Sequence, residues 1–197
     1  MLFTAKSPIT GWRFNTLLAT THIALREVPK KLTTKLIHSK LDLFKNFCNT
    51  YIDKPILKVA GLNPHAGEEG ILGNEEKDWL NSALIAWNEK NRDIQLLGPL
   101  SPDSCWNSSA KAWINKDAER HDGILAMYHD QGLIPMKVIA LNYSVNTTIG
   151  LPFIRTSPDH GTGFDIAGQG IAQCQSMIEA IKAAIEMNKN SRLLNTH

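Results

Sequence analysis

Short apolar runs bounded by turn residues alternate with amphipathic stretches along most of this 197-residue chain. Runs such as FNTLLATT and GILAMY are rich in apolar, aromatic and Thr side chains, and they have the length of buried strands. The predicted strands are 14–21, 56–62, 94–97, 123–128, 137–141 (KVIAL) and 146–149. Several of them run directly into turns, for example at Asn63-Pro64-His65 and at Gly98-Pro99.

Amphipathic stretches between these runs predict helices. Apolar residues recur at helical spacing in 32–51 and 75–88, and Pro29 is a favourable residue for a helix start. A last helix is predicted from about Ile166 to Asn188, with Ile178, Ile181 and Ile185 on one face. Strands that alternate with helices are typical of an α/β protein with a largely parallel sheet.

Composition narrows the class of protein. Hydrophobic residues make up 43% and charged residues 20% of the chain, close to the average for globular domains. A formal net charge of +2 gives no electrostatic reason to expect nucleic acid or an anionic membrane as partner. The lysines at 30, 31, 35 and 40 have the spacing of the solvated face of a helix.

The expected compartment is the cytoplasm. No run approaches the roughly 18 consecutive apolar residues of a membrane span, and the first residues lack the apolar region of a secretory signal. Three cysteines without a CxxC motif suit a reducing environment.

Three histidines follow predicted strands directly, each beside a turn. They are His22, His65 and His129, and parallel α/β sheets place their chemistry at this end of the strands. Neutral imidazoles are suitable ligands for a divalent metal that keeps an open position for substrate. Spacing alone is weak evidence, because a histidine at a strand end is also a common capping or hydrogen-bonding residue.

Longer motifs carry a more specific signal. LLATTHIALREV, GLNPHAGEEGILGNEE, GPLSPDS, AMYHDQGLIPMK and VNTTIGLPFIRTSPDHGTGFDIAGQG occur in this order, from Leu17 past Gly170. Together they resemble the 4-hydroxythreonine-4-phosphate dehydrogenase family of vitamin B6 biosynthesis. The resemblance implies an isopropylmalate dehydrogenase-like α/β/α sandwich, with the second domain nearly complete and the first only partial.

The resemblance also implies roles for individual residues. The histidines of TTH, NPHAG and YHDQG, which are His22, His65 and His129, are expected to bind the metal. Lys137, Asn146 and Arg155 are expected to hold the phosphorylated substrate, since they supply cations and a hydrogen-bond donor. Asp103 and Asp130 match acidic positions near the substrate and, with Lys137, are the candidate catalytic residues.

The DHGTG segment is similar to a nucleotide-contacting loop, which makes Asp159, His160 and Gly161 the candidate cofactor-binding residues. Asp159 and His160 equally fit a role that only fixes the turn. The expected cofactors are NAD or NADP and a divalent metal such as zinc, magnesium, cobalt or manganese. The expected reaction is oxidation and decarboxylation of 4-phosphooxy-L-threonine to 3-amino-2-oxopropyl phosphate, in a homodimer whose metal ligands come from both subunits.

The chain departs from the family in length and at one loop position. Family members are much longer, with a long part before the TTH motif, so we expect an N-terminally truncated member. Residues 1–150 are expected to form the metal- and substrate-binding central domain with the dimer surface, and 151–197 a segment of the cofactor-binding domain. Glu69 stands where the family commonly has glycine. Alternatives are a paralogue acting on threonate or erythronate 4-phosphate, and a non-catalytic metal-binding or dimerisation remnant.

Overall fold

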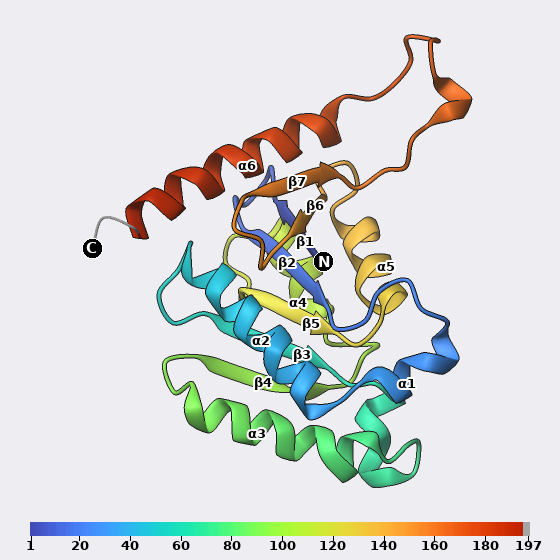
Figure 1. Cartoon of the computed structure of the whole chain (residues 1–197), viewed down its shortest axis with the longest axis vertical. Helices are drawn as coiled ribbons and strands as arrows, with labels where there is room; N and C mark the ends of the chain where they lie inside the picture. The colour runs from blue at the N-terminus through green and yellow to red at the C-terminus, as the bar shows by residue number, and fades with distance from the viewer. Residues whose placement is uncertain (195–197) are drawn as a thin grey trace.

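The computed structural model describes residues 1–194, with side chains described through residue 190. Seven strands in this range form one sheet in the order β4-β3-β5-β2-β1-β6-β7 (Figure 1). The strands are β1 (Leu2–Lys6), β2 (Arg13–Leu18), β3 (Ile56–Ala60), β4 (Gln95–Leu100), β5 (Gly123–Ala126), β6 (Val145–Thr148) and β7 (Arg155–Pro158). The predicted α/β class is confirmed.

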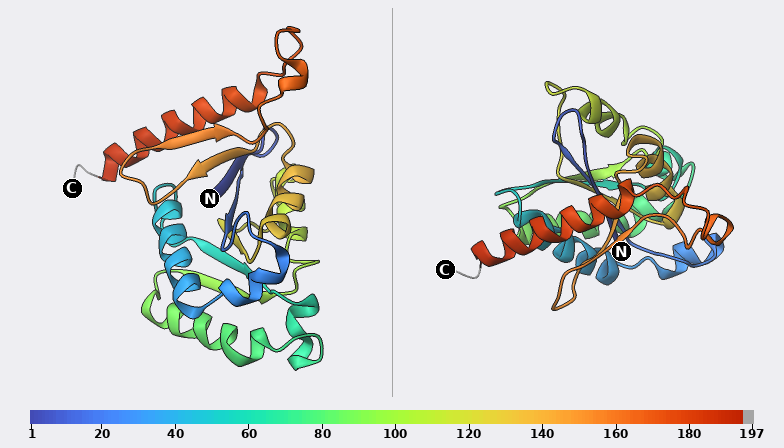
Figure 2. Two further views of the ribbon diagram at one scale, coloured as in Figure 1. Left: turned by 45° about the vertical axis from the view of Figure 1, so that its right-hand side comes forward. Right: turned by 90° about the horizontal axis from the view of Figure 1, so that it is seen from above.

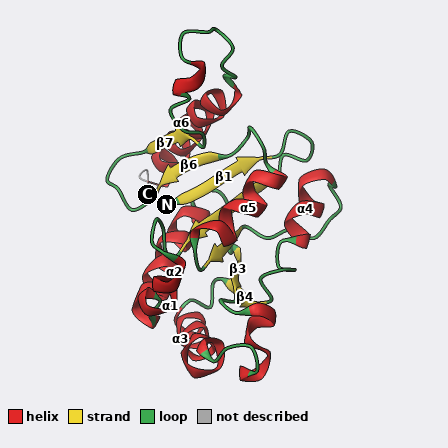
Figure 3. Cartoon of the chain, turned by 90° about the vertical axis from the view of Figure 1, so that its right-hand side faces the viewer, coloured by secondary structure: helices red, strands yellow, loops and turns green. Residues whose placement is uncertain are grey.

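Helices cover both faces of the sheet (Figure 3). The α-helices are α1 (Val28–Lys31), α2 (Thr34–Asn49), α3 (Asn81–Lys90), α4 (Asn107–Ile114), α5 (His129–Ile139) and α6 (Gln175–Leu194). Shorter elements are the 3-10 turns η1 (Leu25–Glu27), η2 (Pro64–Gly70) and η4 (Phe164–Ile166), and the π-helical turn η3 (Glu76–Leu80). None of the helices in the described range is long and apolar enough to cross a membrane.

The sheet is mixed, so the expected largely parallel sheet is only half right. Strands β4, β3, β5 and β2 pair in parallel. Strand β1 pairs antiparallel with both β2 and β6, and β6 pairs antiparallel with β7. The β6–β7 ladder spans residue 150, where a domain boundary was expected, and that boundary stays a prediction.

Two buried clusters lie on opposite sides of the sheet. One packs α1, α2 and α3 against residues such as Leu17, Leu57 and Leu125. The other packs α4 and α5 against residues such as Phe14 and Ile124. At about 25 cal/mol per Å² of buried apolar surface, such fully buried side chains are the main source of stability. The central parallel strands are thus covered on both faces, which fits their nearly continuous apolar sequences.

Two predictions of secondary structure need correction. The run 137–141 was expected to be a strand, but α5 continues to Ile139, because Leu133, Met136 and Ala140 face the sheet at helical spacing. The last helix was expected from about Ile166 but begins at Gln175. Gly168 and Gly170 adopt φ values of 77° and 70°, which a right-handed helix excludes.

Strands β1 and β7 were not predicted. Each has only four or five residues, and β7 (RTSP) has no apolar alternation. The segment between β7 and α6 extends away from the sheet (Figure 2).

Candidate functional site

The carboxyl ends of the four parallel strands carry the residues that the sequence singled out. His22 follows β2, His129 follows β5, His65 follows β3, and Asp103 follows β4. Because these strands are neighbours in the order β4-β3-β5-β2, the four segments succeed one another along one edge of the sheet. This edge is where open α/β sheets bind ligands.

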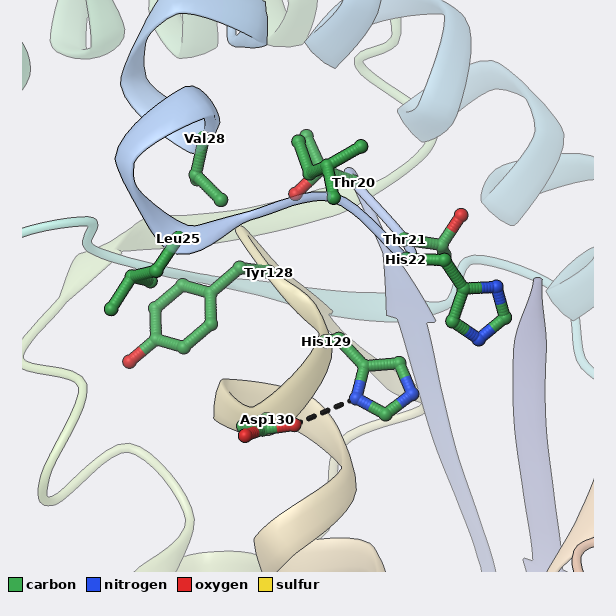
Figure 4. Close-up of a pocket in the computed structure, with 9 residues that line it drawn as sticks. Thr20, Thr21, His22, Leu25, Val28, Tyr128, His129 and Asp130 are labelled. Atoms are coloured by element: carbon green, nitrogen blue, oxygen red, sulfur yellow. Dashed lines mark hydrogen bonds and ion pairs between the residues drawn. The ribbon is translucent and has the colours of Figure 1, made fainter.

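His22 and His129 lie side by side at this edge (Figure 4). Their ring centroids are 5.3 Å apart. They border a cavity of about 270 Å³. Its lining residues are Thr20, Thr21, His22, Ile23, Leu25, Val28, Tyr128, His129 and Asp130. Nδ1 of His129 is 2.7 Å from Oδ1 of Asp130, a contact that leaves Nε2 as the nitrogen available to a ligand.

This pair fits a divalent metal. Two imidazoles on one tetrahedral zinc, with N–Zn distances of about 2.1 Å, have ring centroids about 5 Å apart, close to the separation observed. A carboxylate hydrogen-bonded to the second ring nitrogen is the usual partner of a metal-binding histidine, because it fixes the ring orientation. Asp130 occupies that position.

His65 is held separately from this pair. Its Nδ1 is 3.5 Å from the hydroxyl of Ser101, which donates a hydrogen bond to Asp103. That hydrogen bond is the main reason why the pKa of the exposed Asp103 carboxyl is lowered, and the nearby His65 contributes less. Within residues 1–194, no group of three His, Cys, Asp or Glu side chains is placed to hold a metal. The structure therefore brings together two of the three predicted ligands.

The loop carrying His65 has an unusual backbone. His65, Ala66, Gly67, Glu68 and Glu69 have φ values between 43° and 83°. For residues other than glycine, this left-handed conformation costs roughly 1 kcal/mol each. Glu69, where the resemblance led us to expect glycine, has φ 56°. A glycine would adopt this φ without strain, so contacts elsewhere must hold the loop in this form.

Two residues of the YHDQG motif join the loops at this edge, although the sequence analysis gave them no role. The buried Gln131 accepts a hydrogen bond from the Met127 N–H (2.6 Å) and donates one to the Gly61 carbonyl (2.7 Å). At Gly132, a Cβ would lie 2.6 Å from Cδ2 of Leu18, so only glycine lets α5 approach β2 this closely. The motif's order, with an amide and a glycine directly after the histidine and aspartate, is the sequence signal for both.

Lys137 lies toward the far end of α5, eight residues after His129. At 1.5 Å rise per residue, the two backbone positions are about 12 Å apart along the helix axis. Nζ of Lys137 is 3.4 Å from both the carboxylate and the carbonyl oxygen of Asp159. The structure thus joins a predicted substrate residue to a predicted cofactor residue.

Asn146 and Arg155 lie on one face of the β6–β7 ribbon. Arg155 is opposite Thr148, and it donates a hydrogen bond to the Thr148 hydroxyl (2.8 Å). Asn146 precedes Thr148 by two residues and so shares its face. Oδ1 of Asn146 is buried and has no hydrogen-bond partner among the described residues. Phe3, opposite Asn146 on β1, packs in the cluster beside α5, so this face is the one on which Lys137's helix lies.

His160 and Gly161 border a cavity of about 620 Å³ in the segment between β7 and α6. Asp159 borders a smaller adjoining cavity of about 130 Å³, together with Lys137. A Cβ at Gly161 would meet nothing within 4 Å, so packing does not require glycine there. A ligand can therefore reach the backbone closely at this position. These residues could hold a nucleotide.

Comparison with known proteins confirms the resemblance. Residues 1–184 match the family model described as "Pyridoxal phosphate biosynthetic protein PdxA". A relative from Synechococcus sp. (strain RCC307), named 4-hydroxythreonine-4-phosphate dehydrogenase, is 56% identical over 189 residues, 95% of this chain and 58% of the relative. A relative of the same name from Synechocystis sp. (strain ATCC 27184 / PCC 6803 / Kazusa) is 53% identical over 95% of this chain and 54% of its own length.

Solved structures agree with the fold. The 4-hydroxythreonine-4-phosphate dehydrogenase from Klebsiella pneumoniae superposes with a TM-score of 0.75 at 35% identity, over 94% of this chain and 53% of that one. A terephthalate 1,2-cis-dihydrodiol dehydrogenase from Burkholderia xenovorans LB400 has a TM-score of 0.63 at 27% identity, over 93% and 54% of the two chains. The chain spans a little over half the length of the relatives it matches.

Proposed function

The chain belongs to the pyridoxal phosphate biosynthetic protein PdxA family, and on this premise we propose that it serves the oxidation and decarboxylation of 4-phosphooxy-L-threonine to 3-amino-2-oxopropyl phosphate in pyridoxine biosynthesis. As an oxidoreductase it would use NAD or NADP and a divalent metal. The observation that carries the proposal is the His22–His129 pair, whose rings lie 5.3 Å apart at the carboxyl edge of the parallel strands.

The metal site is proposed around these two imidazoles. When bound there, a divalent metal would supply Lewis-acid polarisation of the substrate's hydroxyl and carbonyl oxygens. Asp130 keeps His129 oriented through its 2.7 Å contact with Nδ1. The apolar side chains of Leu25 and Val28 border the same cavity and would limit the access of water.

Substrate binding is proposed along α5. The helix has His129 at its first residue and Lys137 near its end, about 12 Å apart along the axis. A substrate with a hydroxy acid at one end and a phosphate at the other could contact both ends through the reach of these side chains. Lys137 and Arg155 would supply positive charge to the substrate's anionic groups, and Asn146 would supply an amide donor.

The nucleotide is proposed to bind beside Lys137, in the cavity bordered by His160 and Gly161. Asp159 would hold Lys137 in place through the 3.4 Å contact between its carboxylate and Nζ. NAD or NADP would accept the hydride from the substrate carbon. Asp103, Asp130 and Lys137 are the candidate groups for proton transfer, because each is an acidic or basic side chain that lies on the carboxyl side of a parallel strand or on α5.

The third ligand is proposed to come from a second copy of the chain. His22 and His129 form a pair without His65, and a homodimer could bring the partner's His65 to them. Helix α5 and the turn that follows it offer apolar side chains for such contact, since Ile134 and Val138 on the helix and Leu141 just after it are 61–78% exposed. Exposed apolar patches of this kind mark association surfaces.

An assay of the purified chain tests the proposal. NADH formation would be followed with NAD, 4-phosphooxy-L-threonine and an added divalent metal. His129→Ala is expected to abolish turnover and metal binding, because it removes one of two paired imidazoles. His38→Gln is the matched control, because His38 lies on α2, away from the His22–His129 pair. Its ring contacts the Ala83 carbonyl through Nε2. Turnover by His129→Ala equal to wild type would refute the site.

A second candidate function is a metal-binding and dimerising module without dehydrogenase activity. The paired imidazoles of His22 and His129 suit it as well, because metal binding by itself requires neither the proposed nucleotide site nor the proposed phosphate site. In the same assay this candidate predicts metal binding that His129→Ala removes, and no NADH with any substrate. Threonate and erythronate 4-phosphate belong among the substrates offered, because a structural neighbour is named as a dehydrogenase of a different alcohol.

A further inference from the structure

A buried carboxylate lies under the loop that carries His65. Glu76, only 2% exposed, begins the π-helical turn η3. Its Oε1 accepts hydrogen bonds from the backbone N–H groups of Leu62 (2.7 Å) and Asn63 (2.8 Å). Its Oε2 accepts one from the Asn63 side-chain amide (2.8 Å). Three N–H donors thus satisfy a carboxylate that forms no ion pair in the described part of the chain.

The loop is fitted closely around this carboxylate. A Cβ at Gly67 would lie 2.9 Å from Oε2 of Glu76 and 2.7 Å from the Gly73 carbonyl. A Cβ at Gly73 would lie 2.2 Å from Cγ of Asn63. The Asn63 amide is also held by Oε2 of Glu75 at 2.7 Å. The chain on both sides of His65 is therefore packed closely against Glu76 and Asn63.

His65 depends on this packing for its place. It begins the run of left-handed residues 65–69, a conformation that L-residues adopt only when surrounding contacts impose it. Asn63, two residues earlier, is fixed to Glu76 through both its backbone and its side chain. Gly67, two residues later, lies against Oε2 of the same carboxylate. The exposed imidazole itself has only the 3.5 Å contact with Ser101 to restrain it.

We propose that Glu76 is the positioning residue for His65: its buried carboxylate holds the left-handed loop in the form that presents this imidazole at the carboxyl edge of the sheet. The inference rests on the proposed function in one respect, that His65 is a metal ligand. It assigns a role to a carboxylate that touches neither metal nor substrate, and it explains why a second acid follows Glu75 in the sequence.

The test compares variants of the full chain by titration with Co²⁺, followed by visible absorption and calorimetry. Glu76→Ala is expected to weaken Co²⁺ binding by tenfold or more, about the effect of losing an orienting partner of a metal ligand. The Co²⁺ affinity of Glu76→Gln should lie between those of wild type and Glu76→Ala. The Gln carbonyl still accepts hydrogen bonds from the backbone, while its NH₂ group opposes the Asn63 amide. Glu68→Gln is the matched control: it makes the same charge change at an exposed carboxylate of the same loop, and its affinity should equal wild type.

Two further readouts separate positioning from general damage. In a His65→Ala background, Glu76→Gln should cause no additional loss of Co²⁺ affinity, because its effect passes through the imidazole. Hydrogen exchange in Glu76→Gln should rise in residues 62–73 and stay unchanged in strands β2 and β5. If Glu76→Ala unfolds the whole protein, the Glu76→Gln measurements still test whether Glu76 positions His65.

The possible failures are distinguishable. If His65→Ala weakens Co²⁺ binding while Glu76→Gln and Glu76→Ala bind as wild type, Glu76 does not position His65 and the inference is wrong. Additive losses in the double variant would overturn it as well. If His65→Ala itself binds Co²⁺ as tightly as wild type, the metal-ligand assignment of the proposed function fails and the inference fails with it.

Discussion

The parallel half of the molecule, strands β2 to β5 with helices α1 to α5, contrasts with its C-terminal half, strands β6 and β7 with helix α6. In the parallel half, every residue of β5 is buried, and two large apolar clusters pack on opposite faces of the sheet. In the C-terminal half, the only buried apolar cluster is Val145, Ala180 and Ala183 among the described residues. Ile178, Ile181 and Ile185 of α6 are 38–54% exposed.

This difference in packing corresponds to two proposed roles, metal binding and nucleotide binding. The histidines and acids of the proposed metal site stand on loops fixed by a rigid core, a placement that keeps ligands in position. The residues proposed to bind the nucleotide stand on a segment that extends from the sheet and borders open cavities (Figure 2). Stability should therefore respond strongly to changes in the parallel half and weakly to changes in α6.

The largest expected effect comes from truncating a buried side chain in the parallel half, compared with truncating an apolar side chain of α6 in the C-terminal half. Phe14→Ala removes a fully buried ring that stacks on Trp12 at 5.6 Å and packs edge-on against Trp106, and should cost about 3–5 kcal/mol of unfolding free energy. Ile181→Ala removes a side chain that is 54% exposed, and should change stability by less than about 0.5 kcal/mol. Urea unfolding measures both. Equal losses would mean that the two halves are equally packed, or that α6 is covered by a partner in solution.

Acid should destabilise the parallel half through His121. Burial, with a smaller effect of Lys58, lowers the pKa of His121 from 6.5 to about 3, so the folded protein keeps it neutral while the unfolded chain protonates it. The contribution of neutral His121 to the free energy of unfolding is complete above pH 6.5 and is lost as pH falls toward 3. Between pH 7 and pH 4 the loss should be about 3 kcal/mol.

The free energy of unfolding, measured at pH 7, 5.5 and 4, gives this loss. A chelator is present so that metal binding does not contribute to the pH dependence. His121→Gln keeps a polar group near the Ser109 hydroxyl, 2.8 Å from Nε2 in the wild type, and should flatten the pH profile. His160→Gln, in the exposed C-terminal segment, should leave the profile as in wild type. Parallel profiles for wild type and His121→Gln would show that other groups cause the acid sensitivity.

The smaller of the two pH-dependent effects should come from the ion pairs that tie α6 to the sheet. Arg13 is 2.6 Å from Glu186, and Lys6 is 3.6 Å from it. Burial alone would raise the pKa of Glu186, but the hydrogen bond and charge of Arg13, helped by Lys6, bring it below its ordinary value of 4.5. The stabilisation is therefore present above pH 4.5 and is lost as pH falls through the lower folded-state pKa.

Because Glu186 is partly exposed, solvent screens the pairs, and Glu186→Gln should cost less than about 1 kcal/mol at pH 7. The difference in stability between the variant and the wild type should be smaller at pH 3 than at pH 7, because the charge of Glu186 is progressively lost below pH 4.5. The measurement is the difference between their unfolding free energies at the two pH values. A difference of the same size at both pH values would show that Glu186 contributes packing rather than charge.

The same contrast governs what could be predicted from the sequence. Runs such as 56–62 and 123–128 are long, apolar and bounded by turns, so their strands were predicted closely. The strand β7 (RTSP) is half-buried and polar, and pairing with β6 rather than local preference makes it a strand. The run KVIAL was taken for a strand because its apolar residues are contiguous, while packing against the sheet makes it the end of α5.

For the site, the rule that parallel strands present ligands at their carboxyl ends pointed weakly to His22, His65 and His129, and the motifs around them strengthened the prediction. The structure places His22 and His129 side by side. The separation of His65 from that pair depends on a left-handed loop, which the letters PHAGEEG do not show. Nor does the sequence show that Glu76 turns back under the loop, or that Lys137 meets Asp159, because both contacts depend on how distant segments pack.

The antiparallel pairing of β1 with β6 has a consequence for folding during synthesis. Leu2 pairs with Thr147, so β1 finds one of its two neighbours only after the residues through β6 have been synthesised. The β1–β2 hairpin can form early, but its free edge stays open while the parallel strands assemble. Such long-range closure slows folding and leaves an aggregation-prone edge exposed.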